Sequence, residues 1–182
     1  LVINDLTERL GASLGAVREA LSRLTSEGLV VSEAQRGFTC APVSIDDLME
    51  LTRARVEIES TCMKWAIENG SIEWESRIVA AYHQMVRLDE LSDRKAEVVS
   101  EDWARAHSRF HEALVAGCGN SPLLRVRQNL YEQSERYRRL SIPLRMQSGG
   151  DAHIRAQEAD HRALMQAALD RDTEKARGVM GE

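Results

Sequence analysis

Proline, the residue that most strongly interrupts an α-helix, occurs at only three of the 182 positions. Over most of the chain, apolar residues recur with the i, i+3, i+4 spacing of one helical face. This pattern restricts the fold to a mainly α-helical class. Beyond residue 44 it predicts a six-helix antiparallel bundle, with helices over residues 45–69, 73–92, 97–117, 121–141, 150–170 and 173–182.

Capping residues predict where several of these helices begin and end. Ser44 or Asp46 can cap the first bundle helix, and Gly70 can end it in the left-handed conformation. Ser121 is predicted to cap the helix over 121–141, with Pro122 at its first helical position. Residues 146–150 are rich in polar and glycine residues, and they predict a loop.

The exception to the helical pattern lies near the start of the chain. Two short β-prone runs, residues 29–32 and 38–41, flank a polar link that contains Gly37, and they predict a small hairpin. After Pro42 the helical pattern returns. We therefore divide the chain into an N-terminal unit of residues 1–43 and an all-helical unit of residues 44–182.

Composition excludes some classes of protein. The chain is 43% hydrophobic and 29% charged, and it contains no apolar run long enough to span a membrane. A net charge of −5 argues against general binding to polyanions, which depends on a basic surface. The three cysteines form no C-x-x-C pair, so neither a disulfide framework nor a zinc ribbon is predicted and a cytoplasmic location is favoured.

Residues 1–43 carry the pattern of a helix-turn-helix followed by a wing. Five apolar residues fall on one face of two short helices, which residues 11–13 separate: Leu6, Leu10, Val17, Leu21 and Leu24. Ser13 is placed to cap the second helix, whose first turn would enter the major groove of DNA. Arg18 and Arg23 lie on that helix, and Arg36 and Gly37 lie at the tip of the hairpin.

This part of the chain resembles the winged helix of GntR-family bacterial transcriptional regulators. The resemblance is carried by residues 5–13, the Val-Arg-Glu-Ala-Leu run at 17–21, Glu-Gly-Leu-Val at 27–30 and Arg-Gly-Phe at 36–38. It implies operator binding through Ser13, Arg18, Arg36 and the backbone at Gly37. The chain departs from the family at Leu14, commonly Arg, and at Ala16, often Pro. The family's first helix is absent, so we expect a truncated winged helix that binds DNA less well.

Histidines in the helical unit suggest a metal site. His107 and His111 are four residues apart, which places both imidazoles on the same face of a helix and able to reach one ion. A surface pair of histidines without a metal is the alternative. His161 lies on a helix whose apolar positions face the core, so it can also point inward.

The helical unit resembles the FCD ligand-binding domain of the FadR branch of the GntR family. The resemblance rests on residues 55–59, 110–114, 119–124, 161–169 and 172–180. It implies a divalent metal bound by His107, His111, His161 and a fourth ligand at the position after Glu182. His107 replaces the usual Asp. Because neutral imidazoles favour transition metals over magnesium or calcium, we expect zinc or nickel, with copper also compatible. His153 is a weaker substitute ligand.

Two arginines of the helical unit are candidates to bind an acid. Arg55 and Arg138, with Tyr137 beside the latter, are predicted to hold a carboxylate, because a guanidinium forms forked bidentate contacts with carboxylates. A salt bridge from Arg55 to Glu59 at i+4 is the alternative for Arg55. The effector is thus expected to be a small carboxylic acid.

These patterns, together with the resemblance, predict a transcriptional regulator, and the resemblance implies that it is a homodimer. It would bind palindromic operator DNA, and a small carboxylic acid would control its affinity for the operator. A metal-dependent helical enzyme, such as a hydrolase, is one alternative, although no H-E-x-x-H motif or glycine-rich phosphate loop is present. A ligand-binding or dimerisation module with degenerate DNA binding is the other. We expect no enzymatic activity.

Overall fold

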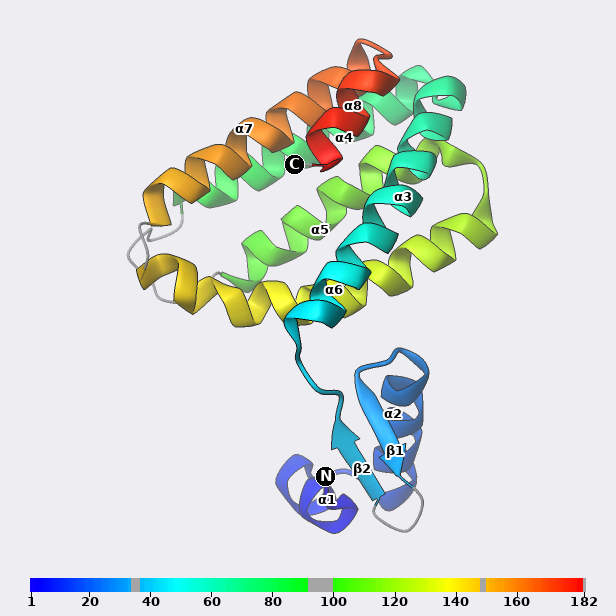
Figure 1. Cartoon of the computed structure of the whole chain (residues 1–182), viewed down its shortest axis with the longest axis vertical. Helices are drawn as coiled ribbons and strands as arrows, with labels where there is room; N and C mark the ends of the chain where they lie inside the picture. Colours follow the sequence, from blue (N-terminus) through cyan, green and yellow to red (C-terminus); the bar gives the residue numbers. More distant parts are fainter. Residues whose placement is uncertain (34–36, 92–99, 148–149, 182) are drawn as a thin grey trace.

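The computed structural model describes the backbone of residues 1–33, 37–91, 100–147 and 150–181, and their side chains except at 91, 141–147, 150–156 and 181. A small unit at the N-terminus and a larger helical bundle are joined by residues 41–44 (Figure 1). The elements are α1 (Ile3–Leu10), α2 (Leu14–Ser26), β1 (Val30–Glu33), β2 (Gly37–Cys40), α3 (Ile45–Asn69), α4 (Ile72–Leu91), α5 (Glu101–Val115), η1 (Ala116–Cys118), α6 (Ser121–Gln147), α7 (Gly150–Leu169) and α8 (Thr173–Gly181).

The N-terminal unit consists of two helices and an antiparallel hairpin, in the arrangement of a winged helix. Strand β1 pairs with β2 so that Val30 lies opposite Cys40 and Glu33 opposite Gly37. Its small core contains Val17, Leu21 and Val30. Leu10, predicted to face this core, is 68% exposed, because α1 ends there and Gly11 turns the chain in the left-handed conformation.

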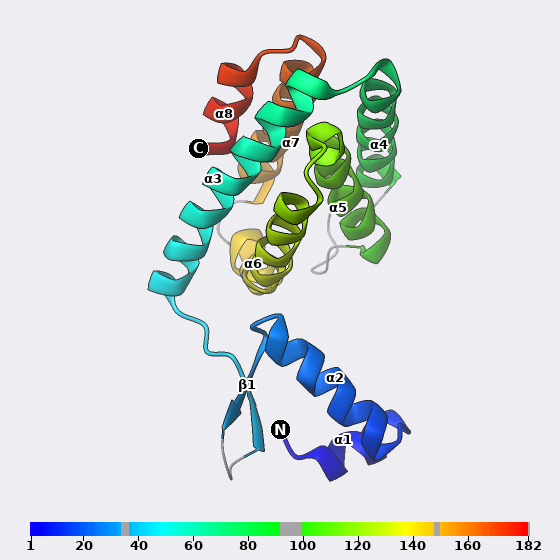
Figure 2. The same ribbon diagram turned by 90° about the vertical axis from the view of Figure 1, so that its right-hand side faces the viewer.

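The bundle buries a single apolar core between α3, α4, α5, α7 and α8. Its largest fully buried side chains are Phe110, Met63, Ile78, Leu114 and Cys62. Helix α4 lies along α5, and α3 packs against α6 and α8 (Figure 2). The mainly α fold, with a winged helix followed by six bundle helices, confirms the predicted fold class. Among the described residues, no helix is long and apolar enough to cross a membrane.

Both ends of the helix predicted over residues 121–141 differ from the structure. Helix α6 does not end at residue 141 but continues through Pro143 to Gln147, so the loop expected at 146–150 is partly helical. Its N-cap is Asn120 rather than Ser121, because the Asn120 side-chain oxygen accepts a hydrogen bond from the Leu123 N–H at 2.9 Å. Helix α3 begins at the predicted cap, where Ser44 Oγ accepts from the Asp47 N–H at 3.0 Å.

The glycine after α3 is required for packing rather than for a left-handed turn. Gly70 has φ −67° and ψ 141°, an extended conformation that any residue can adopt. A Cβ atom on Gly70 would lie 2.1 Å from Cε3 of Trp74. The Trp74 ring is fixed in turn, because its Nε1 donates to the Ala113 carbonyl at 2.9 Å. Glycine therefore lets the indole cover the end of α3.

Candidate metal and effector site

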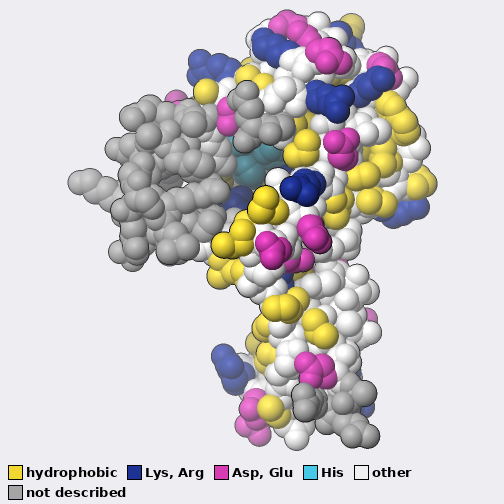
Figure 3. Space-filling view, in the orientation of Figure 1, with side chains coloured by type: hydrophobic (Ala, Val, Ile, Leu, Met, Phe, Trp, Pro, Cys, Tyr) yellow, Lys and Arg dark blue, Asp and Glu magenta, His cyan; other side chains and the backbone are white. Residues whose placement is uncertain are grey.

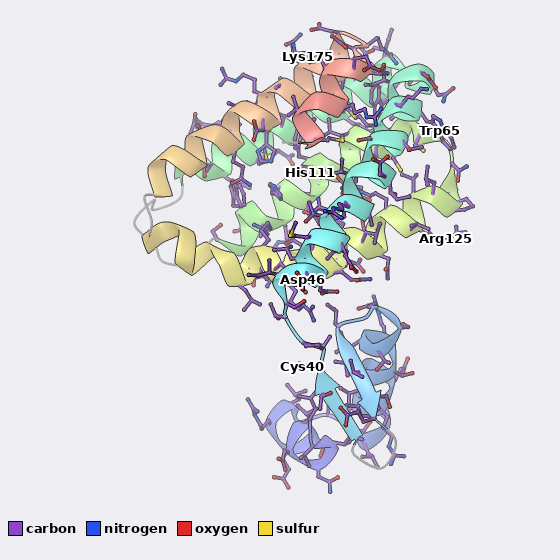
Figure 4. The ribbon with its side chains drawn as sticks, in the orientation of Figure 1. Cys40, Asp46, Trp65, His111, Arg125 and Lys175 are labelled. Atoms are coloured by element: carbon purple, nitrogen blue, oxygen red, sulfur yellow. The ribbon has the colours of Figure 1, made fainter. Side chains whose placement is uncertain are left out.

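Three histidines from two helices meet inside the bundle. His107 and His111 lie on α5, one turn apart, and His161 comes from α7; one potential ligand atom of each lies within 4.8 Å of those of the others. His107 and His161 are buried, at 4% and 5% exposed. Figure 4 shows His111 in the interior of the bundle. The structure thus brings together all three predicted metal ligands that it describes. The side chain of His153 lies outside the described residues.

The spacing of the histidine nitrogens suits a metal ion. The Nε2 atoms of His111 and His161 are 3.3 Å apart. Two imidazole nitrogens bound to one tetrahedral zinc at about 2.0–2.1 Å would be separated by about 3.3 Å. The side chains present therefore fit a divalent transition metal without rearrangement of this pair.

The three imidazoles are uncharged at neutral pH, as metal ligands must be. Burial, followed by the proximity of His161 and the nearby arginines, lowers the pKa of His107 to about 2. Burial and then Arg138 lower the pKa of His161 to about 4. Burial, with the neighbouring histidines, also lowers the pKa of His111 well below its usual value. Each ring can therefore offer a nitrogen lone pair to an ion.

Two aromatic side chains contact His107, one on the face of its ring and one at Nδ1. The Trp103 ring stacks on His107, with 4.9 Å between centroids and 24° between planes. The hydroxyl of Tyr131, on α6, lies 3.3 Å from His107 Nδ1, within hydrogen-bonding distance. Burial raises the pKa of Tyr131, which keeps the phenol neutral. A partner at Nδ1 orients a histidine ring and leaves its Nε2 for a metal.

Arginines surround this cluster. Arg55 of α3 lies 3.3 Å from Glu59, so the predicted alternative of an i+4 salt bridge is present in the structure. Its guanidinium also lies 5.6 Å from the centre of the Tyr131 ring. Arg138 of α6 forms two 2.6 Å hydrogen bonds with Glu135 and lies 5.9 Å from the Trp103 ring. Both predicted effector-binding arginines are thus near the histidines.

A hollow reaches the histidines from the surface. In the space-filling view, histidine atoms are visible at its floor (Figure 3). A pocket that is partly open to solvent has His161 in its wall. It is lined by Tyr82, Met85, Val86, Asp89, Trp103, Gln157, Glu158 and His161. The wall next to His161 is mainly aromatic and apolar.

Helix α2 presents the predicted DNA-contacting residues on the N-terminal unit. Ser13 caps this helix, accepting a hydrogen bond from the Ala16 N–H at 3.2 Å. Arg18 is exposed, and Arg23 is exposed but paired with Glu27 at 2.8 Å. Gly37 begins β2 with φ +85°, a conformation that favours glycine. Arg36 lies outside the described residues.

Comparison with known proteins supports the same assignment for both units. Residues 1–40 match the bacterial regulatory proteins of the gntR family, and residues 50–182 match the FCD domain. The chain belongs to the GntR family and carries an FCD domain. This confirms the resemblance on which the predictions rest.

Individual relatives of this GntR regulator cover almost the whole chain. It is 39% identical over 175 residues to an uncharacterized HTH-type transcriptional regulator, BphR, of Paraburkholderia xenovorans, covering 96% of this chain and 69% of BphR. It is 34% identical to the HTH-type transcriptional repressor GlaR of Escherichia coli, covering 96% and 78%. The solved structure of E. coli McbR/YncC is similar in fold, with a TM-score of 0.77, 22% identity and coverage of 100% and 81%. These relatives are regulators, which supports a regulatory role rather than an enzymatic one.

Helix α6 of this GntR protein also holds the segment between its two domains. Arg136 donates from Nη1 to the carbonyl of Ala41 and from Nη2 to that of Pro42, each at 3.1 Å. Tyr137, predicted to bind the effector, instead donates a hydrogen bond to Asp47 and accepts one from Arg136. The structure therefore places Tyr137 at the interdomain segment.

The sequence patterns did not single out two arginines of α6. Arg127 is 2% exposed and lies 4.7 Å from the Tyr131 ring, while Arg136 contacts the interdomain segment. Arginine on a helix is normally solvated, so its presence in the sequence carries no signal of burial. The four-residue spacing of Arg127 and Tyr131 was the available indication, since residues at i and i+4 share one helical face.

Proposed function

We propose that this GntR-family regulator binds a palindromic operator as a homodimer and that a small carboxylic acid controls its affinity for that operator. The acid binds in the FCD domain, beside a divalent transition metal held by His107, His111 and His161. The observation that carries this proposal is the convergence of three uncharged imidazoles, two of them buried and that of His111 half-buried, next to the cationic side chains of Arg55 and Arg138.

The donor set favours zinc or nickel. Among the described residues the donor set consists of three imidazole nitrogens, which suit a borderline transition metal better than magnesium or calcium, since those ions prefer oxygen ligands. When bound, the metal supplies a positive charge and an open coordination position for an oxygen of the acid. The chain's own residues orient the ligands: Trp103 stacks on His107, and Tyr131 lies at its Nδ1.

The winged helix supplies the DNA-binding surface. Arg18 and Arg23 project from α2, and arginine side chains can contact guanine or phosphate in the major groove. Exposed apolar residues on the bundle, including Ile72, Val79 and Val126, are available for contact with a second copy. Dimerisation through the bundle would set the spacing of two winged helices on two half-sites.

A gel-shift experiment tests the proposal. The complete protein, loaded with zinc, is titrated onto the DNA upstream of its own gene, with and without a panel of mono- and dicarboxylic acids. We expect a shift that one or more acids alter, and that Arg18→Ala weakens about tenfold or more through loss of a base or phosphate contact. Arg9→Ala, at the exposed end of α1, is the matched control. Absence of any shift, or a shift that no acid alters, would contradict the proposal.

A further inference from the structure

Arg127 is a charged side chain buried in the bundle, and two of its nitrogens form no hydrogen bond with a described residue. It lies on α6 and is only 2% exposed. Among the residues that the structure describes, its Nε and Nη2 atoms have no hydrogen-bond partner, and Nη1 makes a long contact of 3.4 Å to Gln128. A buried guanidinium with unsatisfied donors is costly, because its desolvation is not compensated.

The charge around Arg127 is also incompletely balanced. Its Nε lies 3.5 Å from Glu59 Oε1, within ion-pair distance but without hydrogen-bond geometry. The same oxygen receives long contacts from Arg55, at 3.3 Å from Nη2 and 3.4 Å from Nε. Two guanidinium groups thus share one carboxylate, which leaves this triad of Arg55, Glu59 and Arg127 with a net charge of +1.

The two unused nitrogens of Arg127 lie on one edge of the guanidinium. Nε–H and the adjacent N–H of Nη2 point in the same direction and match the two oxygens of a carboxylate in a bidentate contact. The guanidinium lies close to the metal cluster, since Arg127 Cζ is 4.7 Å from the Tyr131 ring centre and that ring is 6.2 Å from the ring of His111. Tyr131 therefore bridges Arg127 and the histidines.

We infer that Arg127 is a specificity-determining residue that receives a carboxylate of the effector on its Nε and Nη2 edge. This inference rests on the proposed function, in which the effector is a small acid. The carboxylate satisfies both donors and neutralises the remaining charge of the triad. Arg127 therefore selects acids over neutral molecules of the same shape, whereas Glu59 weakens binding by repelling the same carboxylate.

The test measures binding of defined probes directly, without DNA. Zinc-loaded protein is titrated with acetate, succinate and benzoate, each compared with its neutral amide, and followed by thermal shift and calorimetry. We expect wild type to bind at least one acid and none of the amides. Arg127→Gln should weaken that acid about 10- to 100-fold. Arg127→Lys keeps the positive charge but cannot form the bidentate contact, so it should retain only part of the wild-type affinity.

Two further variants separate ligand binding from a structural role. Glu59→Gln removes the competing negative charge, so we expect it to bind the acid more tightly; a purely structural role would make this variant weaker or neutral. Arg105→Gln, on the exposed face of α5, should bind as wild type does. Zinc content and circular dichroism establish that each variant is folded and metal-loaded.

The outcomes distinguish this inference from the proposed function. If Arg127→Gln binds the acid as tightly as wild type, or if wild type binds none of the probes, the role of Arg127 is overturned. Unchanged acid affinity in Arg127→Gln, together with acid-dependent release of DNA by wild type, overturns the role of Arg127 and leaves the proposed function intact. If acid binding depends on Arg127 but the acid leaves the affinity for DNA unaltered, the role of Arg127 is supported and the proposed control of DNA binding is overturned.

Discussion

Arg136 of α6 donates a hydrogen bond of 3.1 Å to the carbonyl oxygen of Ala41, which lies in the segment that leads from the winged helix to the bundle. The same helix carries Tyr131, whose hydroxyl lies 3.3 Å from His107. Helix α6 is therefore in contact with both the histidine cluster and the interdomain segment. A rigid helix in contact with both is a physical route for energetic coupling between them.

Replacing Arg136 should reduce this coupling. We expect Arg136→Ala to decrease the effect of an acid on operator affinity by about 0.5–2 kcal/mol, roughly two- to thirty-fold, because the interdomain segment loses two hydrogen bonds. The metal content and the acid affinity of the isolated protein should remain at the wild-type values. Operator titrations with and without acid measure the change.

The control for this experiment is Arg139→Ala, an exposed arginine on the same helix. Both variants remove one positive charge from α6, so a general electrostatic effect on DNA binding would appear in both. An acid response that Arg136→Ala leaves at the wild-type level would show that α6 does not carry the coupling.

Removing one histidine should release the metal. We expect His111→Ala to lose most of its bound ion, because a cluster of three imidazoles would become a pair and affinity falls when a ligand is lost. Elemental analysis of the purified protein measures the content. His83→Ala, an exposed histidine on α4, should retain the ion. Equal metal in both variants would argue against this site.

The metal-free protein should lose stability in mild acid. His107 and His161 have pKa values lowered to about 2 and about 4 in the folded state, while histidines in an unfolded chain titrate near 6.5. Below pH 6.5 the unfolded state therefore binds more protons, and the free energy of unfolding falls as the pH decreases. The slope reaches up to about 1.4 kcal/mol per pH unit for each histidine that stays neutral.

Urea denaturation in the presence of chelator, at pH values from 7.5 down to 5, measures this slope. His161→Ala should show a smaller dependence on pH, because one of the titrating groups has been removed. Stability that is constant over this range would indicate that the histidines take up protons in the folded protein as they do in the unfolded chain.

Packing at Gly70 should be intolerant of a methyl group. A Cβ atom there would lie 2.1 Å from Trp74 and 2.6 Å from the Ala66 carbonyl, so Gly70→Ala requires the indole or the helix end to move. We expect a loss of about 1–3 kcal/mol in the free energy of unfolding. Gly178→Ala, in α8 with nothing within 4 Å of the added atom, should instead stabilise the protein by about 0.5–1 kcal/mol. Equal effects of the two substitutions would contradict this explanation.

Sequence patterns predicted which segments are helical better than they predicted the residues at which the helices end. The span of α3 was predicted as residues 45–69, which is also its span in the structure, because Ser44 caps it and apolar periodicity runs throughout. Helix α6 was predicted to end at residue 141, but it continues through Pro143 to Gln147. Gly70 was assigned a turn conformation, whereas its role depends on a tryptophan that only the folded chain brings against it.

In the candidate site, too, local sequence patterns predicted some features, whereas others depend on how the helices pack. His107 and His111 could be paired from their spacing, and the family resemblance added His161, 50 positions further along the chain. The burial of Arg127 depends on how α6 is rotated about its own axis, and a local pattern does not determine that rotation. The orientation of Tyr137 toward Asp47 likewise depends on where α3 crosses α6.

The lowered pKa values of the histidines also determine how the metal acts on its surroundings. Since the imidazoles hold no acidic proton to release at neutral pH, loading a divalent ion is not accompanied by proton loss, unlike loading a thiol site. The ion therefore adds its full charge to the interior, and the region formed with Arg55, Glu59 and Arg127 changes from +1 to +3. Metal availability in the cell would thus set how strongly the regulator attracts any anion.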